Sequence, residues 1–247
     1  MASLRRWSLA AAHVDTTGAP TVRATSLGAL PQDLTIDLER TAVIVVDMQN
    51  DFCTPGGWLD AIGVDVAMAA AAVDPLRRLL PRLRDGGVSV IWLNWGNRAD
   101  VANLPPNVLH VYDADGTGGG IGDRVGSSDA VLVAGSWGAE IVDGLDVEPT
   151  DIHVSKYRMS GFFDTALDSI LRSLRVDTIL FAGVNADQCV LATLTDAACL
   201  GYDVVLVEEA SATTSPAFCL DATVYNVRQC FGFTTTPAQL ETALSSS

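Results

Sequence analysis

Runs of apolar residues recur along the chain between polar and glycine-rich segments, and their lengths predict strands alternating with helices. The stretch 41–46 is apolar and mostly β-branched, and it ends at Asp47. Such a run is typical of a strand buried on both faces of a parallel sheet. A second run of this kind covers 88–93, and the Ala- and Leu-rich stretch 66–84 between them predicts a helix, although it contains two prolines.

The alternation resumes after residue 129 and continues to the end of the chain. Strands alternating with helices predict an α/β fold, a doubly wound and mainly parallel sheet with helices on both faces in three layers. In such folds the active site lies beyond the carboxyl ends of the strands. The further strands are expected at 151–155, 178–182, 202–207 and 231–235, and the helices at 164–174 (with Asp164 as its cap), 187–200, 216–229 and 237–244.

The remaining parts of the chain are less regular. Residues 1–38 are weakly patterned and predict an N-terminal extension, which leaves 39–247 as one domain. Arg5 and Arg6 resemble a twin-arginine signal, but the apolar stretch after them is too short for a secretion signal. The segment 96–128 holds a glycine cluster at 116–122 that matches no phosphate-binding motif, so we interpret it as a surface loop or an active-site lid.

Charge and apolar content narrow the classes of function. The 247 residues carry a formal charge of −15, which argues against a general affinity for nucleic acid or an anionic membrane. No apolar run reaches the roughly 18 residues of a membrane-spanning helix. A small molecule meets the local field of a site rather than the net charge, so a small-molecule substrate remains compatible with this composition.

Cysteine and histidine usage indicates the compartment and disfavours a metal site. The five cysteines are odd in number and none has C-x-x-C spacing, which predicts a reducing compartment and a cytoplasmic location. The three histidines lie far apart in the sequence, and none forms an H-x-x-x-H pair. We therefore expect no metal and no cofactor.

Three chemically distinct side chains lie at the carboxyl ends of three predicted strands. Asp47 ends the first strand, Lys156 directly follows the strand at 151–155, and Cys189 lies shortly after the strand at 178–182. Because the carboxyl ends of parallel strands meet at one edge of the sheet, these groups should lie together. Lys156 is the only lysine of the chain, which indicates that a compact point charge is needed there.

Cys189 is expected in the first turn of a helix. With Asp187 as the N-cap, the helix dipole would favour the thiolate and lower the thiol pKa from about 8.5. The unpaired N–H groups of a first turn could bind a developing oxyanion. A buried cysteine that packs as a small hydrophobe is the common alternative. We prefer that alternative for the other cysteines, with Cys53 less certain because it lies near the predicted site: Cys53, Cys199, Cys219 and Cys230.

Three motifs in this order resemble the isochorismatase-like cysteine hydrolases. They are Val46-Asp-Met-Gln-Asn-Asp-Phe52, Lys156 ahead of Ser160-Gly-Phe-Phe163, and Gly183-Val-Asn-Ala-Asp-Gln-Cys189-Val, within a resemblance that covers about 40–237. The resemblance implies a catalytic triad of Asp47, Lys156 and Cys189. It also implies a cis peptide between Val184 and Asn185, with the backbone N–H groups of Asn185 and Cys189 as the oxyanion hole.

The subgroup follows from finer features of the same resemblance. Residues 92–98 contain no histidine, unlike the metal site of nicotinamidases, and the nucleophilic cysteine disfavours isochorismate hydrolysis. The stretches 135–138 and 160–172 resemble the ureidoacrylate, biuret and triuret enzymes, which implies an amidohydrolase acting on a ureido compound. The family also implies a homo-oligomer, a dimer or a tetramer. The substrate contacts that we expect are Phe52, Asn94, Trp95, Phe162 and Gln229. For the three aromatic residues among them, ordinary core packing is an equally good interpretation.

Two alternatives stay open. The first is an amidase of another specificity, acting on an N-carbamoyl amine, a nicotinamide-like ring or a larger natural-product lactam. The size and openness of the pocket under 96–128 would separate these substrates. The second is a non-catalytic protein that uses a low-pKa thiol as a redox sensor.

Overall fold

Six parallel strands form the central sheet of the protein. The computed structural model describes residues 8–11, 13–15, 22–125 and 129–245. Each neighbouring pair in the order β10-β9-β8-β5-β6-β7 runs parallel, which confirms the predicted α/β fold. The strands are β5 (Thr41–Val46), β6 (Ser89–Trp95), β7 (Ile152–Lys156), β8 (Thr178–Gly183), β9 (Asp203–Ser211) and β10 (Phe233–Thr235).

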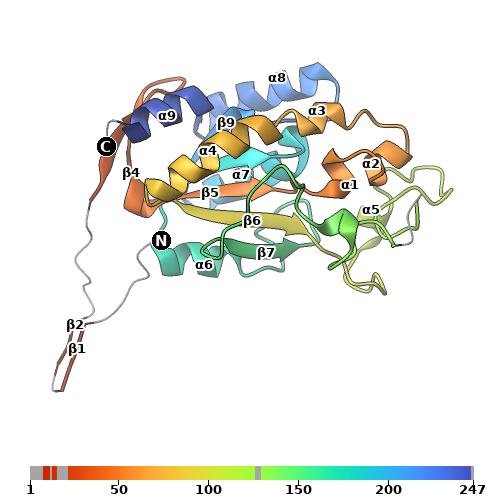
Figure 1. Cartoon of the computed structure of the whole chain (residues 1–247), viewed down its shortest axis with the longest axis horizontal. Helices are drawn as coiled ribbons and strands as arrows, with labels where there is room; N and C mark the ends of the chain where they lie inside the picture. The colour runs from red at the N-terminus through yellow and green to blue at the C-terminus, as the bar shows by residue number, and fades with distance from the viewer. Residues whose placement is uncertain (1–7, 12, 16–21, 126–128, 246–247) are drawn as a thin grey trace.

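The two central strands are buried along their whole length. Every residue of β5 and of β8 is buried, as their unbroken apolar runs predicted. Helices flank the sheet on both sides, with α4 and α9 lying beside each other and α7 packed against β9 (Figure 1). The longer helices are α4 (Val73–Asp85), α6 (Leu167–Leu174), α7 (Leu191–Cys199), α8 (Ala217–Asn226) and α9 (Pro237–Ser245).

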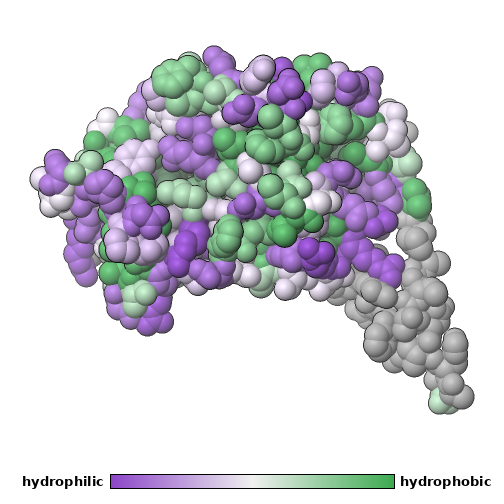
Figure 2. Space-filling model, turned by 180° about the vertical axis from the view of Figure 1, so that it is seen from behind, coloured by the Kyte–Doolittle hydropathy of each residue, from purple (hydrophilic) through white to green (hydrophobic). Residues whose placement is uncertain are grey.

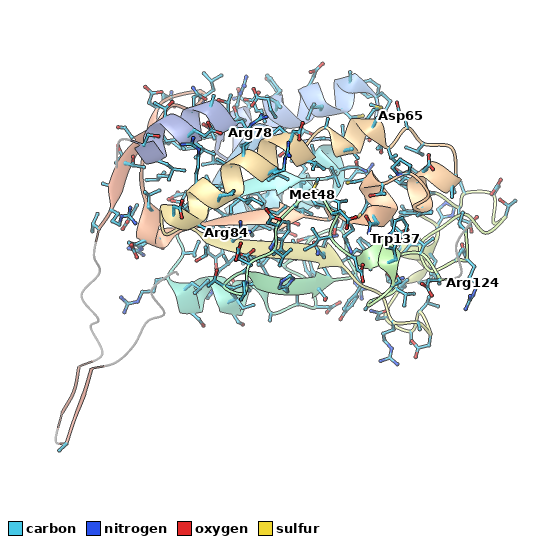
Figure 3. The ribbon with its side chains drawn as sticks, in the orientation of Figure 1. Met48, Asp65, Arg78, Arg84, Arg124 and Trp137 are labelled. Atoms are coloured by element: carbon cyan, nitrogen blue, oxygen red, sulfur yellow. The ribbon has the colours of Figure 1, made fainter. Side chains whose placement is uncertain are left out.

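Helix α4 packs on the sheet through one apolar face. Its buried residues Leu76, Leu79, Leu80 and Leu83 recur at helical spacing and form one apolar face. Arg78 projects from the outer side of the helix in Figure 3. The predicted helix 66–84 is divided in the structure, because α4 begins only at Val73 after the short helix α3 (Ala67–Ala70).

Polar and apolar side chains are interspersed over the face of the molecule seen in Figure 2. No helix among the described residues is long and apolar enough to cross a membrane. The remaining short helices are α1 (Asn50–Cys53), α2 (Trp58–Ala61) and α5 (Pro106–Leu109).

The order of the strands reverses between β5 and β8. From β5 the chain proceeds to β6 and β7 on one side, and from β8 it proceeds to β9 and β10 on the other. Adjacent connections leave in opposite directions at such a point, which opens a crevice at the carboxyl ends of the two strands. Asp47 follows β5 and the segment of Cys189 follows β8, so both arise at this switch point.

Part of the predicted N-terminal extension packs on the domain. Strands β3 (Ala24–Leu27) and β4 (Leu34–Asp37) form an antiparallel pair that contacts α9. The Thr25 hydroxyl donates to the carbonyl of Ala243, and Leu30 pairs with Thr234 of β10. Arg5 and Arg6 lie outside the described residues. Before this segment, β1 (Ser8–Ala10) pairs with β2 (His13–Asp15).

Several element boundaries differ from the sequence prediction. Strand β6 extends to Trp95 and β7 includes Lys156, so these residues lie within strands rather than after them. Helix α6 begins at Leu167 after an N-cap at Ala166, and Asp164 adopts a positive φ before it rather than capping it. The predicted helices at 187–200 and 216–229 each contain a π-helical turn, at Ala186–Val190 and Val227–Phe231.

Candidate active site

Asp47 leaves β5 in a left-handed conformation, with a φ of 49°. Aspartate tolerates this conformation better than most residues, which lets the chain turn sharply at the end of the strand. The Asp47 N–H donates to the carbonyl of Leu93 in the neighbouring strand, and the carboxylate is completely buried. Figure 3 labels the next residue, Met48, which lies where β5 ends.

Lys156 contacts both the Asp47 carboxylate and the Cys189 thiol. Its Nζ lies 2.7 Å from Asp47 Oδ2 and 3.2 Å from Cys189 Sγ, and its side chain is fully buried. The same ammonium donates to the carbonyl of Arg158 at 3.3 Å. The structure therefore brings together the three side chains that the sequence placed at strand ends.

Cys189 lies in the π-helical turn rather than at the start of a regular helix. The N-cap of this turn is Asn185, two residues before the predicted Asp187. The Asp187 carboxylate instead accepts a hydrogen bond from the hydroxyl of Thr213. The peptide between Val184 and Asn185 is cis, as the family resemblance implied. The predicted N-cap is wrong because the hydrogen bond to Thr213 holds Asp187 away from the first-turn N–H groups.

Burial is the largest influence on the pKa of the Cys189 thiol. Burial, opposed by the Lys156 ammonium and reinforced by the negative charge of Asp47, raises the pKa of Cys189 to about 12. The sequence predicted a lowered pKa from the helix dipole. That prediction fails because the side chain is only 5% exposed, so loss of solvation outweighs the dipole.

Burial and charge act in opposite directions on the ion pair. Burial raises the pKa of Asp47, and the Lys156 ammonium limits that rise. Burial alone would lower the pKa of Lys156, but its contacts with Asp47 and Cys189 outweigh that effect, so the pKa of Lys156 is raised. The Lys156 ammonium, the Cys189 thiol and the backbone of Trp95 all lie within hydrogen-bonding reach of the Asp47 carboxylate, and each of them lowers its pKa.

The ring of Trp95 packs against the Lys156 ammonium. The Lys156 Nζ lies 4.2 Å from the centre of the Trp95 ring, in a cation–π contact. Both backbone groups of Trp95 bond to the Gln49 side-chain amide at 2.8 Å, and the indole N–H donates to Asn97. The sequence predicted Trp95 as a substrate contact, and the structure places its ring against Lys156.

The other predicted substrate contacts lie on several different elements of the fold. Asn94 lies on the face of β6 opposite to Trp95, because side chains alternate along a strand. Phe52 is buried with its ring 5.9 Å from that of Trp58, and Phe162 packs 6.0 Å from Tyr202. Gln229 is exposed in the second π-helical turn.

A pocket of about 480 Å³ is lined by Val111, Tyr112, Met159, Ala192 and Gln188, the residue before Cys189. Met159 also contacts Cys189, with its Sδ 3.8 Å from Cys189 Sγ. The sequence analysis missed Met159, because nothing in its local pattern distinguishes it from an ordinary loop residue.

The glycine cluster of the long loop is not an anion cradle. The N–H groups of Gly118 and Gly119 donate to the Asp113 side chain, and that of Gly120 donates to Asp123. The carbonyl of Gly119 accepts from the Trp58 indole. These N–H groups are occupied by carboxylates of the same loop, which supports the interpretation of 96–128 as a loop.

Asp51 is a second buried acid that the sequence analysis did not single out. It accepts from the N–H groups of Trp58 and Leu132, so it holds the loop segments together at the carboxyl edge of the sheet. Burial raises its pKa. A β-carbon at Gly138 would lie 2.4 Å from the Asp51 carboxylate, which explains glycine there. Its place in the Asp47 motif was a possible signal, but its partner Leu132 lies 81 residues away in the sequence and could not be predicted from local pattern.

Within the residues that the structure describes, no three side chains of the usual ligand types converge where they could hold a metal ion.

Comparison with known proteins identifies relatives of this arrangement. Residues 41–239 match the family model of the isochorismatase domain. The chain is 37% identical over 218 residues to the ureidoacrylate amidohydrolase RutB of Rhizobium rhizogenes, an alignment that covers 87% of each chain. It is 36% identical to RutB of Azorhizobium caulinodans, over 89% of this chain and 96% of that protein.

Solved structures agree with these sequence matches. A cysteine hydrolase from Pseudomonas syringae pv. phaseolicola superimposes with a TM-score of 0.72 at 28% identity, over 93% of this chain and 99% of that one. An N-carbamoylsarcosine amidase from Thermoplasma acidophilum gives a TM-score of 0.60 at 26% identity, over 80% and 96% of the two chains.

Proposed function

The chain belongs to the isochorismatase family, as its motifs predicted, and we propose that it is a cysteine-dependent amidohydrolase that opens a C–N bond in a small ureido or amide compound. One observation carries the proposal: the Lys156 ammonium lies 2.7 Å from Asp47 and 3.2 Å from Cys189 Sγ. A nucleophile, a proton acceptor and a cation in mutual contact are what covalent acyl transfer requires.

The first half of the reaction forms a thioester. Asp47 takes the thiol proton as Sγ attacks the substrate carbonyl carbon, and the S–C bond forms. The backbone N–H groups of Asn185 and Cys189 hold the oxyanion, which is worth about 3 kcal/mol per donor. The C–N bond then breaks, and the leaving nitrogen takes the proton from Asp47 and departs as ammonia or an amine.

The second half returns the enzyme to its starting state. A water molecule gives a proton to Asp47 as it attacks the thioester carbonyl carbon. The S–C bond breaks, the acid product leaves, and the proton passes from Asp47 to Sγ. One water is consumed for each C–N bond opened, and no external oxidant or reductant enters the cycle.

Lys156 makes the first step feasible at neutral pH. A thiol whose pKa is raised to about 12 is not ionised in the resting protein, so its proton must leave as the substrate is attacked. A cation at hydrogen-bond distance stabilises the charge that develops on sulfur, and its field keeps Asp47 ionised to accept the proton. This arrangement also argues against the redox-sensor alternative, which needs an accessible thiol of low pKa.

The relatives support a ureido substrate. Both curated relatives act on ureidoacrylate by name, and the structural relative at 26% identity is named for an N-carbamoyl compound. Biuret and triuret belong to the same chemical class. Each of these molecules presents a carbonyl flanked by nitrogen, which Sγ can attack in the way described above.

Ammonia release tests the proposal over a panel of biuret, triuret, ureidoacrylate, N-carbamoyl amines and nicotinamide. The wild-type protein should hydrolyse at least one ureido compound, and Cys189→Ala should lower its turnover by about a thousandfold or more. Cys53→Ala is the matched control, because Cys53 is equally buried but lines a separate pocket. Turnover by Cys189→Ala near the wild-type rate would overturn the mechanism. Silence over the whole panel, with Cys189 readily oxidised by peroxide, would favour the sensor.

A further inference from the structure

The pocket beside Cys189 is larger than the smallest ureido substrates need. Its volume of about 480 Å³ falls within the range that holds drug-sized ligands. Val111 and Tyr112 reach it from the long loop, while Gln188 and Ala192 come from the helical segments on either side of the nucleophile. The pocket therefore offers room for a substituent attached to the reacting group.

Met159 connects this pocket to the nucleophile. It lines the pocket, and its Sδ lies 3.8 Å from Cys189 Sγ. Asp47 and Lys156 are fully buried, so Met159 is the pocket residue through which the lining meets Cys189 Sγ. Methionine is unbranched and flexible, so it can move aside for an apolar group and pack against it afterwards.

The pocket wall is uncharged. Four of the five lining residues present aliphatic, aromatic or thioether groups, and Gln188 supplies an amide. That amide lies 3.3 Å from the Ser215 hydroxyl and 3.5 Å from the Tyr112 hydroxyl. The Tyr112 ring is held in place by an edge contact with Trp58, at 5.4 Å between ring centres.

The cations nearest along the chain are already engaged. Lys156 is paired with Asp47 below the pocket. Arg158 pairs with Asp164 at 3.0 Å and donates to the carbonyl of Asn103 at 2.7 Å. A carboxylate in this pocket would therefore lose water without gaining a charge partner from the described residues that line it.

The charge of the long loop and of the whole chain disfavours an anion as well. The loop segment 96–128 contains four aspartates and two arginines, in a chain of net charge −15. One of the two arginines, Arg98, is already paired with Asp100. A negative surface lowers the local concentration of an anionic substrate and raises that of a neutral one relative to it.

We propose that the substrate carries an uncharged, apolar group in this pocket, so that the enzyme prefers N-alkyl or N-aryl ureas and amides to carboxylate-bearing ureido acids. This inference rests on the proposed function and narrows its substrate class. It separates the chain from relatives named for ureidoacrylate, a substrate that bears a carboxylate.

A matched pair of ureas tests the inference. Isopentylurea and 3-ureidopropanoate have the same number of heavy atoms and differ by an isopropyl group in place of the carboxylate, and ureidoacrylate is assayed beside them. We expect kcat/KM for isopentylurea to exceed that for each acid by about tenfold or more, because the carboxylate of each acid would lose water in the pocket without gaining a charge partner. Calorimetry with the Cys189→Ala protein should show the same order of Kd without any chemistry.

A charge introduced in the pocket supplies the second arm. Ala192→Arg places a cation on the wall and should move the preference towards 3-ureidopropanoate, whereas the neutral control Ala192→Gln should not. Faster turnover of either acid by the wild-type protein would overturn the inference and leave the amidohydrolase proposal standing. Failure of the wild-type protein to hydrolyse any urea or amide, in contrast, would overturn both.

Discussion

The Lys156 ammonium lies 2.7 Å from the Asp47 carboxylate, and neither side chain is accessible to solvent. Taking two such charges out of water costs several kcal/mol per ion, and replacing a buried pair by apolar residues often leaves a protein equally stable. The pair is therefore poorly explained as a stabilising contact. Its position beside Cys189 Sγ fits the proposed role of Asp47 as the acceptor of the thiol proton.

The first prediction concerns the acid side of the pH profile. Asp47 must be ionised to take the thiol proton, and burial raises its pKa above 3.8 while Lys156 opposes the rise. Activity should therefore fall as pH drops through a value above 3.8, and Lys156→Met should move that fall to higher pH. The measurement is kcat/KM as a function of pH for the wild-type protein and for the residual activity of Lys156→Met. Arg77→Met, which breaks an exposed pair with Asp74, is the control and should not move the profile.

The second prediction uses the fact that Lys156 is the only lysine of the chain. Protein grown with 13Cε-labelled lysine should give one side-chain signal. Because the pKa of Lys156 is raised above 10.5, this signal should not titrate below that pH. Asp47→Asn removes the main charge that opposes the burial effect, so titration should then begin at a lower pH. A wild-type signal that titrates well below pH 10.5 would contradict the charged lysine.

The third prediction concerns stability. Lys156→Met leaves a buried carboxylate without its partner and should lower the free energy of unfolding at neutral pH by about 3–5 kcal/mol. The loss should shrink as pH falls and Asp47 becomes protonated. The double variant Asp47→Asn/Lys156→Met removes both charges and should recover most of the loss, with urea unfolding as the measurement. Equal stability of the single and double variants would contradict the account.

The sequence predicted the features of this site that depend on nearby residues, and it failed for those that depend on segments far away in the chain. Asp47, Lys156 and Cys189 each follow or end a strand, so the rule for parallel sheets placed them together without any knowledge of contacts. The environment of Cys189 could not be read in the same way. Its pKa depends on burial by segments far away in the sequence, and the local dipole argument therefore predicted the wrong direction.

The direction in which side chains point was the second feature that the sequence did not predict. Trp95 and Asn94 are neighbours in the sequence and were both expected at the substrate, but β6 extends further than its apolar run indicated and points them to opposite faces. The packing of Trp95 under Lys156 follows from the register of two strands, Trp95 opposite Lys156, which pairs residues 61 positions apart. No local pattern records that register.

The last prediction concerns Gly183, at the junction of the strands that carry Asp47 and Cys189. Its φ is +109°, and a β-carbon there would lie 2.1 Å from the carbonyl oxygen of Val46 and 2.6 Å from its nitrogen. Both contacts are to the backbone of β5, so a rotamer change cannot relieve them. Gly183→Ala should therefore force the two central strands apart and lower the free energy of unfolding by more than about 4 kcal/mol.

Gly116→Ala separates this clash from backbone strain. Gly116 also has a positive φ, of +69°, but no atom of the described residues lies within 4 Å of the place that a β-carbon would take in this exposed loop. Its replacement should cost only about 1 kcal/mol, the strain of the conformation itself. Thermal unfolding of the two variants gives the comparison. If Gly183→Ala were as stable as Gly116→Ala, the close approach of β5 and β8 would not be what fixes Asp47 opposite Cys189.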